Sequence, residues 1–319
     1  MKISFDNREI NHEHGRSLLD SLLEAEVKIP NSCRMGSCQT CLVRALEGSI
    51  PAAAQVGLKP SQQALGLLKS CVCHPTEDMT ITLGEAQNQS SAIVVEKLML
   101  NEQILRLKLQ VNKPFQYEAG QFINLVRSKD NLSRSYSLAS IPSESTIELH
   151  IRCYEQGQMS TWLKNTVNEG DSVEINGAYG ECFYTAEEQQ QPLLLAGIGT
   201  GMAPLYGILR DALKKGHKGP IHVVQGAMNE DGLYYVEEFQ KIAAEFGNCS
   251  YIPAIVKGSG AYRQGKIDEV IKDLFPSLKG YKVFLCGSPG TVSRLRRYSF
   301  LAGASMSAIY SDPFTIAGK

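Results

Sequence analysis

The sequence predicts a multidomain protein of the α+β and α/β classes. With 319 residues, the chain is longer than one hydrophobic core usually supports. Three apolar patterns follow one another along it: a mixture of short strands and one helix, then mostly strands, then strands alternating with helices. We expect domains at residues 1–87, 91–188 and 190–319, with a polar linker at residues 87–91.

The first segment is predicted to open with a strand at residues 2–5. A leucine-rich helix follows, and Ser17 stands directly before it, where a side-chain oxygen can cap the first turn. A cysteine-rich loop comes next, and further strands are expected after it at residues 42–46 and 79–83. This segment is therefore a small α+β unit.

The middle segment alternates apolar and polar residues at 104–109 and 147–151, as half-buried strands do. One helix is expected near residues 159–164. Short strands separated by turn residues predict an antiparallel β-barrel.

The last segment alternates strands with helices, which predicts a parallel sheet with crossover helices. The expected strands are residues 193–196, 221–225, 251–256 and 283–286. The expected helices are residues 203–214, 236–246 and 292–301.

Composition is that of an ordinary soluble protein, with 43% hydrophobic and 20% charged residues and a formal net charge of −1. No strong charge favours nucleic acid or an anionic membrane. The N-terminus has no signal-peptide pattern, and no apolar run reaches the roughly 18 residues of a membrane span. We expect a cytoplasmic monomer that binds neither nucleic acid nor membranes.

Five of the nine cysteines lie between residues 33 and 73. Cys33, Cys38 and Cys41 have the spacing C-x4-C-x2-C, and Cys71 follows after 29 intervening residues. This is the plant-type ferredoxin spacing for a [2Fe–2S] cluster. A zinc site usually combines two similar cysteine pairs, so zinc fits this triplet less well.

Cys73 competes with Cys71 for the fourth ligand position. We favour Cys71 because Pro75 follows it at a spacing that resembles the end of the ferredoxin motif. Gly36 and Ser37 allow the loop backbone to approach the inorganic sulfides and to donate N–H groups to them.

Arg134, Ser135, Tyr136 and Ser137 lie in a predicted barrel strand. They resemble the Arg-x-Tyr-Ser flavin signature of the ferredoxin–NADP reductase superfamily. An arginine can bind pyrophosphate oxygens, a tyrosine can pack on the flavin, and the last serine can sit against flavin N5. Taken alone, so short a pattern also fits an ordinary strand. Its position between the other motifs of the superfamily makes it specific for a flavin site.

Two neighbouring segments resemble the same superfamily. Gly120 and Gln121 match the strand that leads to the flavin signature. Gly157 and Ser160 match a second phosphate contact at the start of a helix, where backbone N–H groups and the helix dipole favour anions.

A glycine-rich turn follows the strand at residues 193–196. Gly199, Thr200, Gly201 and Pro204 belong to a Gly-Thr-Gly-x-Ala-Pro motif, which lets the backbone approach a pyrophosphate. The motif resembles the nicotinamide-binding half of the superfamily and differs from the Rossmann fingerprint.

Two C-terminal motifs complete the resemblance. Cys286, Gly287 and Pro289 match Cys-Gly-x-Pro, whose cysteine lies near the nicotinamide and flavin N5 in the family; the alternative is a buried small residue. Asp312 and Phe314 match an acid two residues before an aromatic that shields the flavin, although five residues follow Phe314 here.

The nicotinamide is predicted to be NADH rather than NADPH. A 2′-phosphate usually requires a basic residue after the second strand of this sheet, and residues 226–232 contain none. Met228 replaces an arginine found in relatives, and Glu230 and Asp231 repel a phosphate. Alternatively, these acids form an ordinary solvated loop.

Together the motifs resemble the reductase components of bacterial multicomponent oxygenases. The resemblance implies a β-grasp ferredoxin domain, a six-stranded FAD-binding barrel and a five-stranded parallel nicotinamide-binding sheet. It also implies that FAD takes hydride from NADH and passes single electrons to the cluster. The expected acceptor is an oxygenase or hydroxylase component of the Rieske or carboxylate di-iron type.

Two other functions stay open. The same reductase chemistry serves non-oxygenase partners in some relatives, such as deoxysugar dehydratases. A redox sensor or electron-relay subunit without nicotinamide turnover is the third hypothesis, and the intact nicotinamide motifs argue against it. We interpret Cys153, Cys182, Cys249 and Trp162 as structural, and we assign no role to the histidines.

Overall fold

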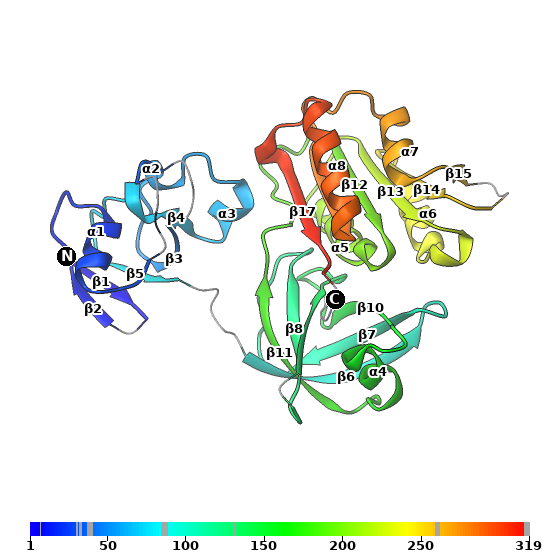
Figure 1. Cartoon of the computed structure of the whole chain (residues 1–319), viewed down its shortest axis with the longest axis horizontal. Helices are drawn as coiled ribbons and strands as arrows, with labels where there is room; N and C mark the ends of the chain where they lie inside the picture. The colour runs from blue at the N-terminus through cyan, green and yellow to red at the C-terminus, as the bar shows by residue number, and fades with distance from the viewer. Residues whose placement is uncertain are drawn as a thin grey trace. The chain divides into compact units, whose positions relative to one another are not determined.

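The computed structural model describes residues 1–6, 8–29, 31, 34–36, 41–83, 89–130, 132–258 and 262–315. The chain divides into two compact units, Met1–Gln87 and Asn88–Lys319 (Figure 1).

The first unit is built on a five-stranded sheet with the order β2-β1-β5-β3-β4. β1 pairs antiparallel with β2 and parallel with β5, which confirms the β-grasp prediction. The strands are β1 (Lys2–Phe5), β2 (Arg8–Asn11), β3 (Leu42–Glu47), β4 (Leu67–Lys69) and β5 (Met79–Thr82). The helices are α1 (Leu18–Glu24), α2 (Ala52–Gln55), α3 (Pro60–Ala64) and the short 3-10 helix η1 (Ser70–Val72).

Helix α1 begins where the sequence predicts. The Ser17 hydroxyl accepts a hydrogen bond from the Asp20 backbone N–H at 3.2 Å, which satisfies one of the free donors of the first turn. Leu18 and Leu22 are fully buried in the core of this unit, together with Ile3 of β1. The apolar face of the helix thus covers the sheet.

The first half of the second unit is a six-stranded antiparallel sheet with the order β10-β7-β6-β11-β8-β9. An isolated bridge between Leu138 and Leu149 joins its two outer strands, so the sheet curls into the predicted barrel. The strands are β6 (Gln89–Met99), β7 (Ile104–Val111), β8 (Phe122–Arg127), β9 (Leu132–Ser137), β10 (Ile147–Arg152) and β11 (Ser172–Tyr179), and the helix is α4 (Gln158–Asn165).

The predicted linker at residues 87–91 is partly wrong. β6 begins at Gln89, and Ser90 and Ser91 pair with Ile175 and Glu174 of β11. Backbone hydrogen bonds rather than apolar side chains hold these serines in the barrel. The first residues of β6 therefore lack the apolar alternation by which a strand is predicted from sequence.

The second half is a parallel sheet with the order β15-β14-β13-β12-β16-β17. Its strands are β12 (Leu193–Ile198), β13 (Ile221–Ala227), β14 (Cys249–Ile255), β15 (Arg263–Gln264), β16 (Lys282–Gly287) and β17 (Ile309–Pro313). Its helices are α5 (Met202–Lys214), α6 (Val236–Glu245), α7 (Ile267–Leu274) and α8 (Pro289–Leu301), with the short 3-10 helices η2 (Gly199–Gly201), η3 (Glu230–Gly232) and η4 (Met306–Ala308).

Helices cover both faces of this sheet (Figure 1). Leu205 of α5 and Phe239 of α6 pack in one core, while Ile271 of α7 and Leu295 of α8 pack in another. The expectation of five strands is corrected to six, because the two-residue β15 pairs with the end of β14. Arg263 and Gln264 have no apolar alternation that would predict a strand.

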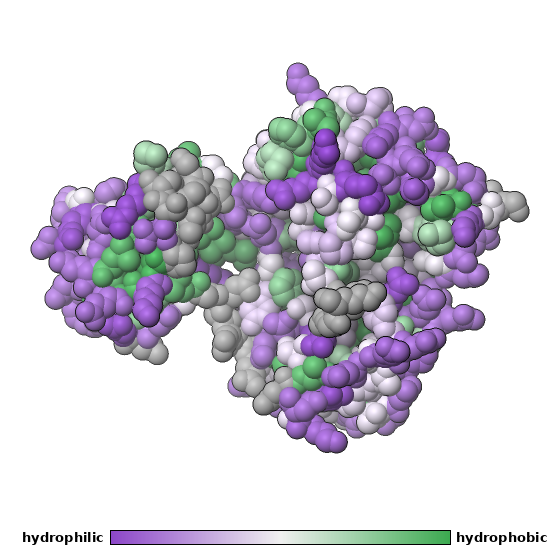
Figure 2. All heavy atoms as spheres, in the orientation of Figure 1, coloured by the Kyte–Doolittle hydropathy of each residue, from purple (hydrophilic) through white to green (hydrophobic). Residues whose placement is uncertain are grey.

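The surface offers scattered apolar groups on a mainly hydrophilic face (Figure 2). Among the described residues, the most exposed large apolar side chains are Met35 (76%), Leu301 (71%) and Val56 (68%). None of the helices in the described part of the chain has the length and apolar character that a membrane crossing requires.

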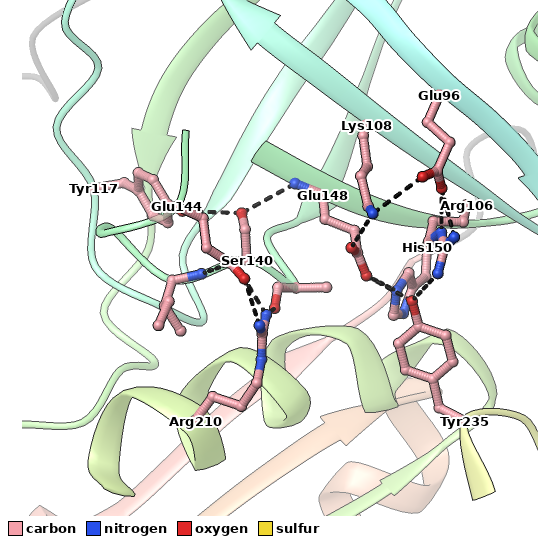
Figure 3. Close-up of polar contacts among 12 residues, drawn as sticks. Glu96, Arg106, Lys108, Tyr117, Ser140, Glu144, Glu148, His150, Arg210 and Tyr235 are labelled. Carbon is pink, nitrogen blue, oxygen red and sulfur yellow. Dashed lines mark hydrogen bonds and ion pairs between the residues drawn. The ribbon is translucent and has the colours of Figure 1, made fainter. Parts of the chain in front are cut away.

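A polar network joins the barrel to the C-terminal sheet (Figure 3). The Tyr235 hydroxyl donates to the Glu148 carboxylate at 2.8 Å and accepts from the Arg106 guanidinium at 3.0 Å. His150 Nε2 lies 2.8 Å from the same carboxylate. Burial lowers the pKa of His150, so the ring is neutral and donates from Nε2, while Nδ1 accepts from the Tyr234 hydroxyl.

We expect Glu148→Ala to lower the free energy of unfolding by about 3 kcal/mol, because it leaves buried donors without an acceptor. Burial alone raises the pKa of Glu148, but the hydrogen bonds from His150 and Tyr235 and the charge of Arg106 outweigh it and lower the pKa. This stabilisation is therefore present above the ordinary glutamate pKa of ~4.3 and is lost as the pH falls through the lower folded-state value.

Urea titration of the full chain, followed by circular dichroism at pH 7 and pH 3, measures the effect of Glu148→Ala. Asp273→Ala, which removes an exposed partner of Arg263, serves as the control and should change little. Equal urea concentrations at the unfolding midpoint for wild type and Glu148→Ala at pH 7 contradict the prediction.

Candidate functional site

Three predicted catalytic residues meet where the barrel contacts the parallel sheet. The Ser137 hydroxyl, at the end of β9, donates to Asp312 Oδ2 of β17 at 3.0 Å. Asp312 is directly opposite Cys286 in the pairing of β17 with β16. The hydroxyl, carboxyl and thiol therefore come from three different strands and gather at the carboxyl end of the parallel sheet, where ligands bind in such folds.

Burial sets the charge of this cluster. It raises the pKa of Asp312, although the hydrogen bond from Ser137 opposes the shift. Burial also raises the pKa of Cys286, helped by a hydrogen bond with the Cys182 thiol. Cys286 is 2% exposed and therefore remains a neutral thiol at pH 7.

The sequence predicts only a structural role for Cys182, and the structure places its thiol beside that of Cys286. It lies in the segment after β11, and its carbonyl oxygen would lie 2.5 Å from a Cβ at Gly120. No motif surrounds Cys182 in the sequence, so only the folded structure reveals this neighbour.

The flavin signature lies on β9 with alternating exposure. Arg134 and Tyr136 are partly buried on one face, and Tyr136 packs against the barrel core. Arg134 uses one of its five N–H donors on the Ser133 carbonyl, at 2.7 Å. Ser135 points to the other face, where its hydroxyl donates to the Asn124 side chain.

In the structure, Gly120 and Gln121 contact other residues of this unit. Gly120 has φ +100°, and a Cβ there would meet both the Cys182 carbonyl and the Ile208 side chain. The buried Gln121 donates from Nε2 to the Gly180 carbonyl and accepts from the Glu118 N–H. Their contact with a flavin stays a prediction, and their contacts here shape the strand that precedes the signature.

The start of α4 fits the binding of an anion. Gly157 is its N-cap and supplies no side-chain cap, so the first N–H groups of the helix stay available. A Cβ at Gly157 would lie 2.3 Å from the Ser160 hydroxyl, which donates to the Gly157 carbonyl. A side chain at Gly157 would therefore displace the Ser160 hydroxyl, which closes the turn.

The glycine-rich turn after β12 is a short 3-10 helix, Gly199–Gly201, that leads into α5. A Cβ at Gly201 would lie 2.4 Å from the Cys286 carbonyl oxygen, so the turn packs directly on β16. Thr200 is half-buried in the turn, and Pro204 is buried in the first turn of α5. No side chain caps α5, but the Met202 N–H bonds carbonyl oxygens of the preceding 3-10 turn and Pro204 carries no N–H, so a phosphate contact at this turn stays a prediction.

The Cys-Gly-x-Pro motif forms the end of β16 and the start of α8. Gly287 has φ +131°, and a Cβ there would lie 3.0 Å from the Ile198 carbonyl oxygen. Pro289 is the first residue of α8, a position where its missing N–H costs nothing. The Phe314 N–H donates to the Gly287 carbonyl at 2.7 Å, which fixes Phe314 beside the motif.

The cluster ligands are described in part. Cys33 and Cys38 lie outside the described residues, while Cys41 and Cys71 are 3% and 9% exposed. Ser70 joins their segments, because its N–H and its hydroxyl both bind the Cys41 carbonyl, at 3.1 and 2.8 Å. This pairing places Cys71 next to Cys41, and two neighbouring buried cysteines fit thiolate ligation of a cluster.

Arg134→Ala should weaken FAD binding roughly tenfold or more, because hydrogen bonds to charged groups contribute about 1.5–3 kcal/mol. The flavin-to-protein absorbance ratio after gel filtration measures this loss. Arg296→Ala, on an exposed part of α8, is the matched control. Full flavin content in Arg134→Ala rules out the predicted contact.

Comparison with protein families identifies the three parts of the chain. A 2Fe-2S iron-sulfur cluster binding domain matches residues 2–76, an oxidoreductase FAD-binding domain matches 91–184, and an oxidoreductase NAD-binding domain matches 194–296. The expected [2Fe–2S], FAD and NAD(P)H cofactors are confirmed. The fold and these domains define an NAD(P)H-dependent flavin and iron–sulfur oxidoreductase.

Whole-chain relatives narrow the class further. The chain is 32% identical over 324 residues to the ferredoxin–NAD(P)+ reductase component of the naphthalene 1,2-dioxygenase system of Pseudomonas putida, covering 98% of both proteins. It is 30% identical to the phenol hydroxylase P5 protein of Acinetobacter pittii, over 88% of this chain and 84% of that one. The crystal structure of the Amycolatopsis cytochrome P450 reductase GcoB matches all of both chains with a TM-score of 0.72 at 29% identity.

The protein therefore belongs to the family of ferredoxin-fused flavin reductases that includes the reductase components of multicomponent oxygenases, within the ferredoxin–NADP reductase superfamily.

Proposed function

We propose that the protein transfers electrons from NADH through FAD and a [2Fe–2S] cluster to an oxygenase or hydroxylase component. The meeting of Ser137, Asp312 and Cys286 carries the proposal, because it brings the flavin signature to the carboxyl end of the nicotinamide-binding sheet. FAD accepts a hydride and releases single electrons, which a one-electron cluster can take. Ser137, Cys286, Asp312 and Phe314 line the place of hydride transfer in this proposal.

The proposed binding residues follow the motifs. Arg134, Tyr136 and the start of α4 hold the flavin, and the turns after β12 and β16 hold the nicotinamide. The proposed cluster ligands are Cys33, Cys38, Cys41 and Cys71.

The preference for NADH rests on the loop after β13. Met228 is 59% exposed at the loop start, and Glu230 and Asp231 form the 3-10 helix η3. Lys257 is one cation beside this loop, and its backbone N–H donates to the Met228 carbonyl at 2.8 Å. The two negative charges of Glu230 and Asp231 outnumber the positive charge of Lys257, so the electrostatics of the loop disfavour a 2′-phosphate.

We expect kcat/KM for NADH to exceed that for NADPH at least tenfold, and Met228→Arg to narrow this ratio by adding a phosphate-binding cation. Steady-state reduction of cytochrome c with each donor measures both values. Met228→Leu is the matched control and should keep the wild-type ratio. Equal efficiency with NADPH in the wild type contradicts the proposed donor.

The relatives support an oxygenase acceptor, since their names assign them to a dioxygenase system, a phenol hydroxylase and a cytochrome P450. The test mixes the protein and NADH with purified Rieske and di-iron oxygenase components. Product formation that depends on this protein supports the proposal. Electron transfer to none of these components, with cytochrome c reduction intact, points to a non-oxygenase acceptor.

We also propose a monomer that acts in the cytoplasm without membrane attachment. The free thiols of Cys73, Cys153 and Cys249 suit a reducing compartment. Light scattering and cell fractionation test these two points.

A further inference from the structure

Lys69 is a buried cation next to the cysteine-rich loop. It is the last residue of β4, two residues before Cys71, and it is 4% exposed. Lysine is almost never buried to this degree unless its charge is paired. The cysteine spacing does not require a lysine at this position. The other two residues of β4 are leucines, so Lys69 is the one charged residue of the strand.

The contacts of Lys69 point its ammonium group at the loop between the first two predicted ligands. Nζ donates to the Gly36 carbonyl at 2.9 Å and to the Val56 carbonyl. Gly36 has φ +74°, and a Cβ there would lie 3.2 Å from Nζ, so the glycine also leaves room for the lysine.

Lys69 and Ser70 together hold the loop at two points. Lys69 binds Gly36, which lies between Cys33 and Cys38, and Ser70 binds the carbonyl of Cys41. The segment that carries Cys71 thus contacts the cysteine-rich loop on both sides of the second predicted ligand.

The charge of Lys69 lacks an anionic side-chain partner. Among the described residues, Nζ forms no ion pair with a carboxylate, and its two acceptors are the neutral carbonyls of Gly36 and Val56. A buried cation requires compensation. A [2Fe–2S] cluster with four thiolate ligands carries net negative charge and can supply it.

We propose that Lys69 is a positioning residue that holds the cluster loop and raises the reduction potential of the [2Fe–2S] cluster. The cluster gains one electron from the reduced flavin and no proton, so reduction adds one negative charge. A fixed buried cation stabilises that added charge, since Coulomb interactions are stronger away from water. This inference rests on the proposed ligand set.

The test is the midpoint potential of the cluster in the holoprotein, measured by redox titration with electron paramagnetic resonance. Lys69→Gln removes the charge and keeps an N–H donor for the Gly36 carbonyl. We expect its equilibrium constant for one-electron reduction to fall about tenfold, which is about 59 mV to lower potential. Lys69→Arg keeps the charge and should stay close to wild type.

Lys28→Gln makes the same charge change at an exposed position of the same unit and should leave the potential unchanged. An unchanged potential in Lys69→Gln, or equal shifts in Lys69→Gln and Lys28→Gln, overturns the proposal. If the Lys69→Gln protein does not bind the cluster, the midpoint potential is measured in Lys69→Met instead. Loss of the cluster from both neutral variants leaves Lys69 a structural residue only and also overturns the tuning role.

A wild-type protein without the cluster signal overturns the proposed ligand set and function instead, so the two failures are distinguishable.

Discussion

Cys71→Ser is expected to abolish the visible absorbance of the iron–sulfur cluster and the NADH-dependent reduction of cytochrome c. Reduction of the flavin by NADH should continue at close to the wild-type rate, because the hydride-transfer residues lie in the other unit of the chain. The effect should be all-or-none, since a cluster of this type requires four cysteine ligands.

Cys73→Ser is the matched control for this experiment. Cys73 is fully buried in the core of the first unit, and its carbonyl accepts from the Leu18 N–H at the start of α1. Its variant should keep the cluster and the cytochrome c activity. A lost cluster in Cys73→Ser, with a normal one in Cys71→Ser, would falsify the assignment of the fourth ligand.

Ser137→Ala should slow the reduction of the flavin by NADH about a hundredfold, because loss of a positioning contact beside the reacting atoms can cost about 10² in rate. The variant removes the hydroxyl that joins β9 to Asp312. Flavin content should stay normal, since Arg134 and Tyr136 are unchanged. Single-turnover stopped-flow absorbance gives the rate directly.

Ser135→Ala separates this role from a general effect on the strand. Ser135 lies two residues before Ser137 on the same strand, is exposed, and bonds Asn124. Its variant should keep the wild-type rate of flavin reduction. If Ser135→Ala and Ser137→Ala slow the reaction equally, the hydroxyl of Ser137 has no special place in hydride transfer.

Local patterns predicted much of the fold. The cap at Ser17 and the apolar face of α1 were readable because both depend on residues close in sequence. The period-two strands of the barrel and the strand–helix alternation of the last segment were readable for the same reason. Helix α7, Ile267–Leu274, was missed, although its buried residues Ile267, Val270 and Ile271 show helical spacing.

The sequence identified site residues that belong to local motifs. It could not identify contacts between residues far apart in the chain. Cys286 and Asp312 were identified from separate motifs, but only the pairing of β16 with β17 places them side by side. The contacts of Cys182 with Cys286 and of His150 with Tyr234 leave no local signal, because these partners lie 104 and 84 positions away. Lys69 shows only as one charge in an apolar strand, and its partners lie in other loops.

Anaerobic stopped-flow absorbance after mixing the holoprotein with NADH, and separately with NADPH, tests the central claim most directly. We predict that the flavin band bleaches first, that the cluster bands bleach after it, and that NADH is the faster donor. A flavin that stays oxidised with both donors, or cluster bands that bleach before the flavin, contradicts the proposed path from nicotinamide through FAD to the iron–sulfur cluster.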